Sequence, residues 1–270
     1  MGFFDAILLG LIQGITEFLP ISSTGHLILM RELLGLQSAG GELAFDAVLH
    51  LATALAVIIY FSKDIWSIAQ TALRKLGRLP VNQKELTLFY ALAIGTIPAV
   101  VVGVLLESTM ETAFRSPLLV AGVLVAGSLL FIYAEWFIYN SVPNNTVTVK
   151  KGIQIGLFQC LALVPGMSRS GATIAGGMLL GLSRVEAARF AFLLAVPIML
   201  GAGGKKLIEL ISSPATVSWF PILIGAVVAF IVGLLAIHFM LTFVRRHTLW
   251  PFIWYRLLLA AFVAYVYLVA

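Results

Sequence analysis

Long apolar runs separated by short polar connections make up most of the chain, and their lengths predict two kinds of helical element. A bilayer with a hydrocarbon core of about 30 Å is crossed by about 20 helical residues. Six runs are predicted to be membrane-spanning helices: 43–61, 87–106, 118–139, 187–203, 218–244 and 250–269. The pattern therefore predicts an all-α protein whose surroundings are largely lipid.

Four shorter apolar runs form two pairs, each interrupted by a turn. Residues 3–19 and 27–36 flank Pro-Ile-Ser-Ser-Thr-Gly, and residues 153–164 and 172–182 flank Pro-Gly-Met-Ser-Arg-Ser-Gly. None of the four runs crosses a bilayer comfortably by itself. We expect two re-entrant helical hairpins, because irregular backbone at membrane depth is tolerated only where it lines a cavity or is buried in protein.

The second half of the chain repeats the plan of the first. A shift of 146 residues aligns several identical residues, among them Gly10 with Gly156, Gln13 with Gln159, Ser22 with Ser168 and Gly25 with Gly171. Each repeat holds one hairpin and three spans, and an odd number of crossings inverts the second repeat relative to the first. We expect a single membrane domain over 1–270, with two inverted-topology repeats at about 1–140 and 152–270.

The composition supports an integral membrane protein. Apolar residues make up 61% of the chain and charged residues 11%, whereas soluble domains carry about 25% charged residues. The net charge of +5 comes from basic residues in short loops, so we expect no nucleic-acid partner. The single cysteine, Cys160, excludes an internal disulfide and a thiolate metal cluster.

The loop charges predict the orientation in the membrane. Loops 62–86, 140–152 and 245–249 would share one side and carry nine Lys and Arg residues, against four for the other side. Cytoplasmic loops are enriched in basic residues, so both termini are predicted to be extracytoplasmic. The first hairpin then enters from outside and the second from the cytoplasm, so their turns can meet near the midplane.

The first hairpin holds a carboxylate that is costly to bury. Glu17 lies near the predicted bilayer centre, where a charge costs about 2.5–3.5 kcal/mol on insertion scales, and such residues are usually functional. Gln13 lies four residues earlier on the same helical face. A carboxylate with neutral oxygens is a ligand set for Mg²⁺ or Ca²⁺, so Glu17 is a candidate metal ligand. The alternative is that Glu17 pairs with a basic residue of another helix.

The two turns are suited to binding an anion. Each offers hydroxyls and backbone N–H groups at the start of a helix, where the helix dipole favours negative charge. Arg169 adds a planar fork that matches phosphate or pyrophosphate. The remaining candidate substrate-binding residues are Gln13, Ser22, Thr24, Ser168, Ser170 and Thr173. Helix capping is the competing explanation for one hydroxyl in each turn.

His26 follows Ser23 by about one helical turn, a spacing that suits a base or acid beside a hydroxyl or a water. Two mechanisms stay open: Ser23 attacks directly, or His26 activates a water. Other intramembrane polar residues have open roles. His50 and His238 are interpreted as packing or helix-contact residues, and Asp46 and Glu135 as either functional groups or halves of structural pairs.

The stretch Thr-Glu-Phe-Leu-Pro-Ile-Ser-Ser-Thr-Gly-His with Gln13, together with Pro165 to Thr173, resembles the bacitracin-resistance family of bacterial undecaprenyl-pyrophosphate phosphatases. The family's first motif takes Glu or Gln at Gln13 and Glu at Glu17. Its second is Pro-Gly-x-Ser-Arg-Ser-x-x-Thr. Since Gln13 is uncharged, Glu17 is the sole motif carboxylate, and the number of metal ions stays open.

The resemblance implies divalent-cation-dependent hydrolysis of undecaprenyl diphosphate, lipid-carrier recycling for cell-wall synthesis, and bacitracin tolerance. It also implies a homodimer in the bacterial plasma membrane, with the site opening to the outer face. Carried over by motif, the catalytic residues would be Glu17, Ser23, His26 and Arg169. A membrane transporter or flippase of a phosphorylated lipid or anionic solute is the alternative, because inverted repeats and broken helices are transporter features.

Overall fold

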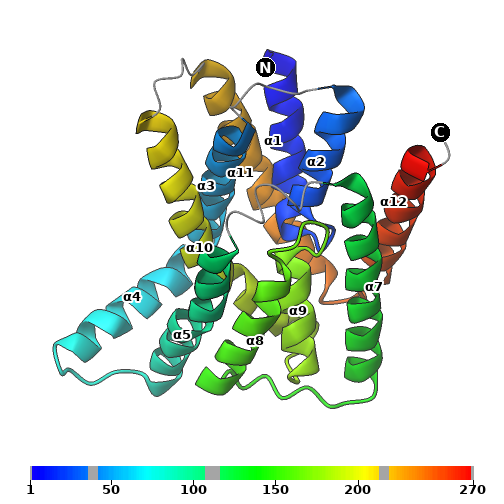
Figure 1. Cartoon of the computed structure of the whole chain (residues 1–270). Coiled ribbons are helices and arrows are strands. Elements are labelled where there is room, and N and C mark those ends of the chain that lie inside the picture. Colours follow the sequence, from blue (N-terminus) through cyan, green and yellow to red (C-terminus); the bar gives the residue numbers. More distant parts are fainter. Residues whose placement is uncertain (1, 36–41, 107–115, 213–218, 269–270) are drawn as a thin grey trace.

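The computed structural model describes residues 2–35, 42–106, 116–212 and 219–268, and within these ranges it holds eleven α-helices and no strand (Figure 1). In chain order they are α1 (Phe3–Phe18), α2 (Ser23–Leu34), α3 (Glu42–Tyr60), α4 (Ser62–Leu76), α5 (Gln83–Leu105), α7 (Pro117–Tyr139), α8 (Val149–Leu161), α9 (Arg169–Leu179), α10 (Arg184–Ser212), α11 (Trp219–Phe243) and α12 (Trp250–Leu268).

Five of these helices, α5, α7, α10, α11 and α12, are long and apolar enough to cross a membrane, and α3 with α4 would make a sixth, bent span. The prediction of an all-α integral membrane protein is confirmed. Predicted runs that reach residues 36, 218 and 269 extend there beyond the described residues. The run predicted at 187–203 is shorter than the helix, because α10 continues to Ser212. The added segment is a polar turn in which Lys206 Nζ lies 3.0 Å from Glu209 Oε2.

The two short helical pairs are built alike. α1 and α2 are separated by a break at 19–22, and α8 and α9 by a longer break at 162–168. Ser22 and Ser168 both have positive φ values, of 78° and 74°, which are uncommon for residues other than glycine. Each serine Oγ accepts a backbone N–H three residues on, from Gly25 at 3.3 Å and from Gly171 at 3.1 Å. This hydrogen bond caps the N-terminus of the second helix in each pair and stabilises the turn that precedes it.

The pairs approach from opposite ends of the molecule. Figure 1 shows α1 and α2 in one half and α8 and α9 in the other, with both turns near the centre. Glycines allow the helices that support them to pack closely. A Cβ on Gly10 would lie 2.5 Å from the carbonyl oxygen of Gly225 in α11, and one on Gly156 would lie 1.9 Å from that of Gly95 in α5. Such backbone contact between membrane helices requires small residues.

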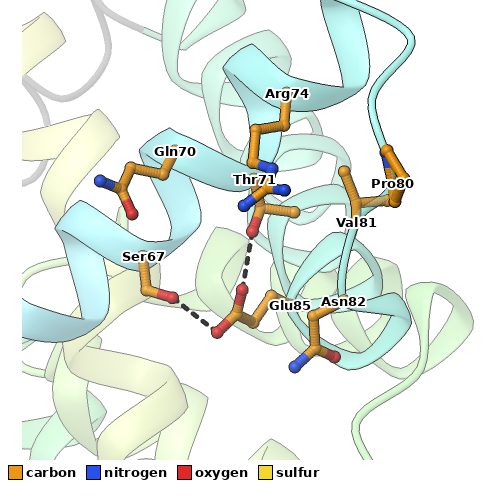
Figure 2. Close-up of a pocket in the computed structure, with 8 residues that line it drawn as sticks. All are labelled: Ser67, Gln70, Thr71, Arg74, Pro80, Val81, Asn82 and Glu85. Atoms are coloured by element: carbon orange, nitrogen blue, oxygen red, sulfur yellow. Dashed lines mark hydrogen bonds between the residues drawn. The ribbon is translucent and has the colours of Figure 1, made fainter.

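α4 leaves the bundle at its junction with α3, where the chain bends by 82° (Figure 1). Its outward side exposes Trp66, Leu73 and Leu76, while Ser67 and Thr71 donate to the Glu85 carboxylate of α5 at 2.6 and 2.7 Å. A cavity of about 290 Å³ lies beside this contact (Figure 2). An apolar stripe on a helix that turns away from a span suits the membrane interface.

The two acids with open roles, Asp46 and Glu135, are halves of ion pairs. The Asp46 carboxylate of α3 accepts hydrogen bonds from both terminal nitrogens of Arg31 in α2, at 2.7 and 2.5 Å. Glu135 of α7 pairs with Arg184 of α10 and also accepts the backbone N–H of Leu249 at 2.7 Å. Removing one member of such a buried pair costs about 3–5 kcal/mol, because the other charge is left uncompensated. The first pair joins α2 to α3, and the second joins α7 to α10.

Candidate active site

Direct contacts join the two turns, although about 150 residues separate them in the sequence. The backbone N–H of Gly166 donates to Ser22 Oγ at 3.1 Å. The Ser170 hydroxyl donates to the carbonyl of Leu19 at 3.2 Å. The Arg169 guanidinium pairs with the Glu17 carboxylate. One polar centre is therefore assembled from both hairpins.

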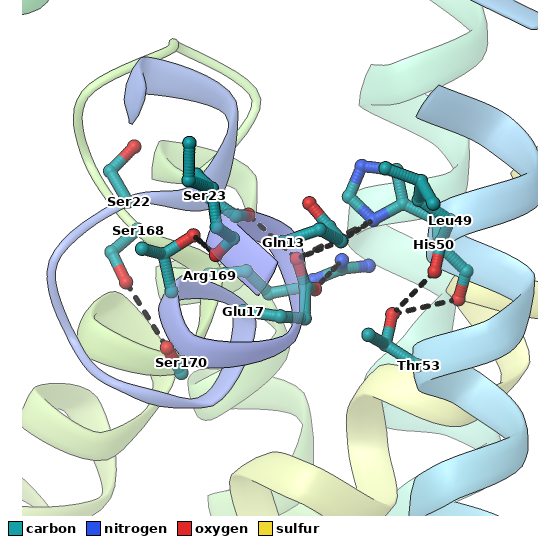
Figure 3. Close-up of polar contacts among 12 residues, drawn as sticks. Gln13, Glu17, Ser22, Ser23, Leu49, His50, Thr53, Ser168, Arg169 and Ser170 are labelled. Atoms are coloured by element: carbon teal, nitrogen blue, oxygen red, sulfur yellow. Dashed lines mark hydrogen bonds and ion pairs between the residues drawn. The ribbon is translucent and has the colours of Figure 1, made fainter. Parts of the chain in front are cut away.

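Glu17 lies at the middle of this centre, with 5% of its surface exposed (Figure 3). Its Oε2 accepts the Ser23 hydroxyl at 2.6 Å and Gln13 Nε2 at 3.0 Å, and its Oε1 faces Arg169. Gln13 reaches it because residues four apart share a helix face. A buried carboxylate is retained only with such partners. Ser23 thus has an acceptor for its proton, which is the geometry of an activated hydroxyl nucleophile.

His50 of α3 belongs to the same network, although its sequence context was interpreted as packing or helix contact. Its Nδ1 lies 3.0 Å from Gln13 Nε2 and 3.4 Å from Glu17 Oε2 (Figure 3). The ring nitrogen therefore faces the Gln13 amide and the Glu17 carboxylate together. The signal in the sequence was a titratable residue in an apolar run, which is a functional hypothesis by default.

His26 does not form the expected pair with Ser23. Its Nδ1 donates to the Ser22 carbonyl at 2.7 Å, and its Nε2 accepts the hydroxyl of Tyr255 in α12 at 2.7 Å. The two rings stack with centroids 5.6 Å apart. Both ring nitrogens are therefore engaged away from Ser23. The three-residue spacing puts Ser23 and His26 on one face of the helix, but the His26 ring bonds to the Ser22 carbonyl, one helical turn earlier, instead.

Three of the other candidate binding residues, Ser168, Ser170 and Thr173, form hydrogen bonds in and beside the second turn. The Ser168 and Ser170 hydroxyls are 3.1 Å apart. Thr173 is fully buried and donates to the carbonyls of Arg169 and Ser170 in its own helix. Thr24, by contrast, is exposed in the first turn of α2. Since α2 begins at Ser23 and α9 at Arg169, the positive ends of two helix dipoles flank Glu17.

The donor set fits a hard cation bound together with a phosphate. Gln13 Oε1 is buried and, within the described part of the chain, has no hydrogen-bond partner. The nitrogen of the same amide donates to the Glu17 carboxylate, which also accepts the Ser23 hydroxyl. The described residues hold no group of three or more His, Cys, Asp or Glu suited to a metal. Mg²⁺ is commonly held by one or two carboxylates with water and substrate phosphates.

The helices and this centre define a multi-pass helical membrane protein with a buried polar site suited to phosphate. Within that class, the chain belongs to the family described as bacitracin resistance protein BacA, whose model matches residues 6–262. The match confirms the resemblance seen in the two motifs.

Curated relatives cover almost the whole chain. The undecaprenyl-diphosphatase of Nitrosococcus oceani is 42% identical over 99% of this chain and 100% of its own length. That of Trichlorobacter lovleyi is 43% identical over 95% of this chain and 94% of its own. The Micrococcus luteus enzyme of the same name is 40% identical over 96% and 95%.

Proposed function

We propose that this chain is an undecaprenyl-diphosphatase, which hydrolyses undecaprenyl diphosphate to undecaprenyl phosphate and inorganic phosphate. The activity recycles the lipid carrier for cell-wall synthesis and gives tolerance to bacitracin. Family membership supports this function. The structural observation that carries it is the buried contact of Glu17 with both Ser23 and Arg169, one from each hairpin. This contact supplies a nucleophile, an acceptor for its proton and a cation for phosphate charge.

The geometry supports attack by Ser23. As the Ser23 Oγ forms a bond to the terminal phosphorus, its proton passes to Glu17, which accepts it at 2.6 Å in the resting site. The bond from that phosphorus to the bridging oxygen breaks, and its electron pair leaves with the lipid monophosphate. Water then attacks the phosphorus of the seryl phosphate, the bond from phosphorus to Ser23 Oγ breaks, and Glu17 returns the proton to that oxygen as inorganic phosphate is released. Arg169 lies where its guanidinium can neutralise charge on the transferring group.

A divalent cation, Mg²⁺ or Ca²⁺, is part of this proposal. Glu17, with the free Oε1 of Gln13 and the Ser23 hydroxyl, would hold it. Bound there with the substrate, the ion would supply charge neutralisation to the diphosphate. Gln13 keeps this role without a charge of its own, because an amide oxygen is an adequate ligand for hard cations.

The architecture is proposed to be two inverted repeats, about 1–140 and 152–270, each with a re-entrant hairpin and three spans. Two pairs of matching features support it. Ser22 and Ser168 have the same backbone turn and the same cap, and Gly10 and Gly156 each pack against a glycine of a spanning helix. The protein would be a homodimer of the bacterial inner membrane, with extracytoplasmic termini and a site open to the outer face.

Phosphate release by purified protein in detergent tests the function. With a C55 or C15 prenyl diphosphate, we expect release that a chelator abolishes and Mg²⁺ or Ca²⁺ restores. Glu17→Ala and Arg169→Ala should both be inactive. Arg189→Ala is the matched control, since Arg189 pairs with Asp64 at 2.5 Å in a part-exposed contact between α10 and α4. No release by folded wild-type protein would instead favour transport of a phosphorylated lipid or anionic solute.

Tyr255→Phe should lower kcat/KM about three- to tenfold. The change removes the hydroxyl that donates to His26 Nε2 at 2.7 Å, and one hydrogen bond contributes about 0.5–1.5 kcal/mol. His26 would then lose one of the two hydrogen bonds that hold its ring against the turn between α1 and α2. Tyr265→Phe, in the same helix on an exposed surface, serves as the control in the phosphate-release assay. Equal rates for the two variants would contradict a role for the Tyr255 hydroxyl.

A further inference from the structure

α12 contributes an arginine that is completely buried and has no acidic partner among the residues that the structure describes. Arg256 is 0% exposed, and among the described residues no carboxylate pairs with it; its hydrogen bonds go to neutral oxygens. A buried charge is normally kept only with a counter-ion or a full set of hydrogen bonds. The motifs of the family do not include this residue, and the hydrolytic steps proposed above do not use it.

The guanidinium contacts oxygens of three separate segments. Nη1 donates to the carbonyls of Pro20 at 3.3 Å and Met167 at 3.1 Å. Nη2 donates to the carbonyls of Gly166 at 3.0 Å and Leu124 at 3.1 Å. Contacts of 3.5 Å from Nη2 to the Val123 carbonyl and of 3.3 Å from Nε to Ser128 Oγ complete the set. A guanidinium has five N–H groups, so these contacts leave none for phosphate.

Three of the carbonyls that Arg256 binds lie where the hairpins lose their helical hydrogen bonds. Pro20 is in the break between α1 and α2, and Gly166 and Met167 are in the break between α8 and α9. Backbone carbonyls away from water need a donor. Arg256 supplies donors to both breaks from one rigid, planar group. It therefore links the first turn, the second turn and α7.

α7 has a slot that fits the guanidinium. A Cβ on Gly127 would lie 2.1 Å from Nη2 of Arg256, so no larger residue fits there without moving the arginine. The Phe131 ring, one turn further along, lies 4.9 Å from the guanidinium carbon, a cation–π distance. Gly127 and Phe131 fix where the fork can lie, and through it the two turns.

We propose that Arg256 is a positioning residue that fixes the two hairpin turns against each other, so that Glu17 and Ser23 face Arg169. The inference rests on the proposed phosphatase function. Pro20 lies between Glu17 and Ser23 in the chain, and Met167 lies two residues before Arg169. A shift of either turn would therefore displace one side of the reacting geometry, and a displacement of about 1 Å can cost about 100-fold in rate.

The first test compares turnover with a C15 prenyl diphosphate in detergent for Arg256→Lys, Gly127→Ala and Gly122→Ala. Lysine keeps the charge but has only three donors on one nitrogen. Gly122 lies in the same helix with nothing within 4 Å of an added Cβ. We expect kcat to fall at least about tenfold for Arg256→Lys and Gly127→Ala, KM to change less than about threefold, and Gly122→Ala to match wild type. These losses should exceed any fall in the folded fraction, measured by gel filtration and thermal melting.

A double-mutant cycle then tests whether Gly127 acts through Arg256. Adding Gly127→Ala to Arg256→Lys should cost less than about twofold more, because the clash with Nη2 no longer exists. The proposal is overturned if Arg256→Lys keeps turnover within twofold of wild type, if Gly127→Ala equals Gly122→Ala, or if the two losses multiply. An inactive wild-type protein would refute the phosphatase function instead, so the two failures are distinguishable.

Discussion

Arg169→Lys is expected to lower kcat for phosphate release by about 100- to 1,000-fold. The guanidinium extends from the second hairpin to Glu17 of the first, and the Arg169 side chain is 20% exposed, so part of it is accessible. Lysine preserves the positive charge but not the planar fork that bonds two phosphate oxygens together. Loss of one pre-organised donor to a transition-state oxyanion typically costs 10²–10³ in rate.

The measurement is steady-state phosphate release with a C15 prenyl diphosphate, alongside thermal melting in the same detergent. Arg184→Lys provides a matched change, because Arg184 also pairs with a buried glutamate, Glu135, away from the turns. That variant should lose stability comparably while keeping its turnover per folded molecule. Turnover by Arg169→Lys within threefold of the control would exclude direct phosphate binding by the guanidinium.

The sequence predicted the parts of the site that are expensive to bury. Glu17 and Arg169 are charges in apolar runs, and each lies beside a Pro, Ser and Gly break. Such charges are retained for function or pairing, and here the pairing that was weighed as an alternative coexists with the proposed function. The order of spans and breaks was predictable for the same reason, since lipid leaves few positions for polar backbone.

The partners of these residues were not predictable in the same way. Tyr255 and Arg256 bind a ring nitrogen and backbone carbonyls, which have no signature in the sequence. His50 reaches Gln13 only because α3 presents that face to α1. His26 shows the opposite error: its spacing from Ser23 suggested a pair, but its ring nitrogens are engaged by Ser22 and Tyr255. Such contacts depend on how each helix is rotated relative to its neighbour, and the residue spacing within one helix does not determine that rotation.

Glu17→Gln is expected to abolish turnover, with a fall of at least about 1,000-fold. The neutral amide cannot take the Ser23 proton that the carboxylate accepts at 2.6 Å, and general-base and nucleophile activation contribute about 10²–10⁴-fold. The change should also destabilise the protein by about 3–5 kcal/mol, because Arg169 loses its buried counter-charge. Lost activity alone would therefore not separate catalysis from folding.

The double variant Glu17→Gln/Arg169→Gln makes that separation. Removing both charges leaves no uncompensated ion, so stability should return to within about 1–2 kcal/mol of wild type while phosphate release stays undetectable. Thermal melting gives the first quantity and phosphate release the second. Recovery of both would show that the pair is structural and that another group activates the nucleophile. If neither stability nor activity recovers, another buried group interacts with Arg169 or Glu17. His50, whose Nδ1 lies 3.4 Å from the Glu17 carboxylate, is then the first residue to substitute.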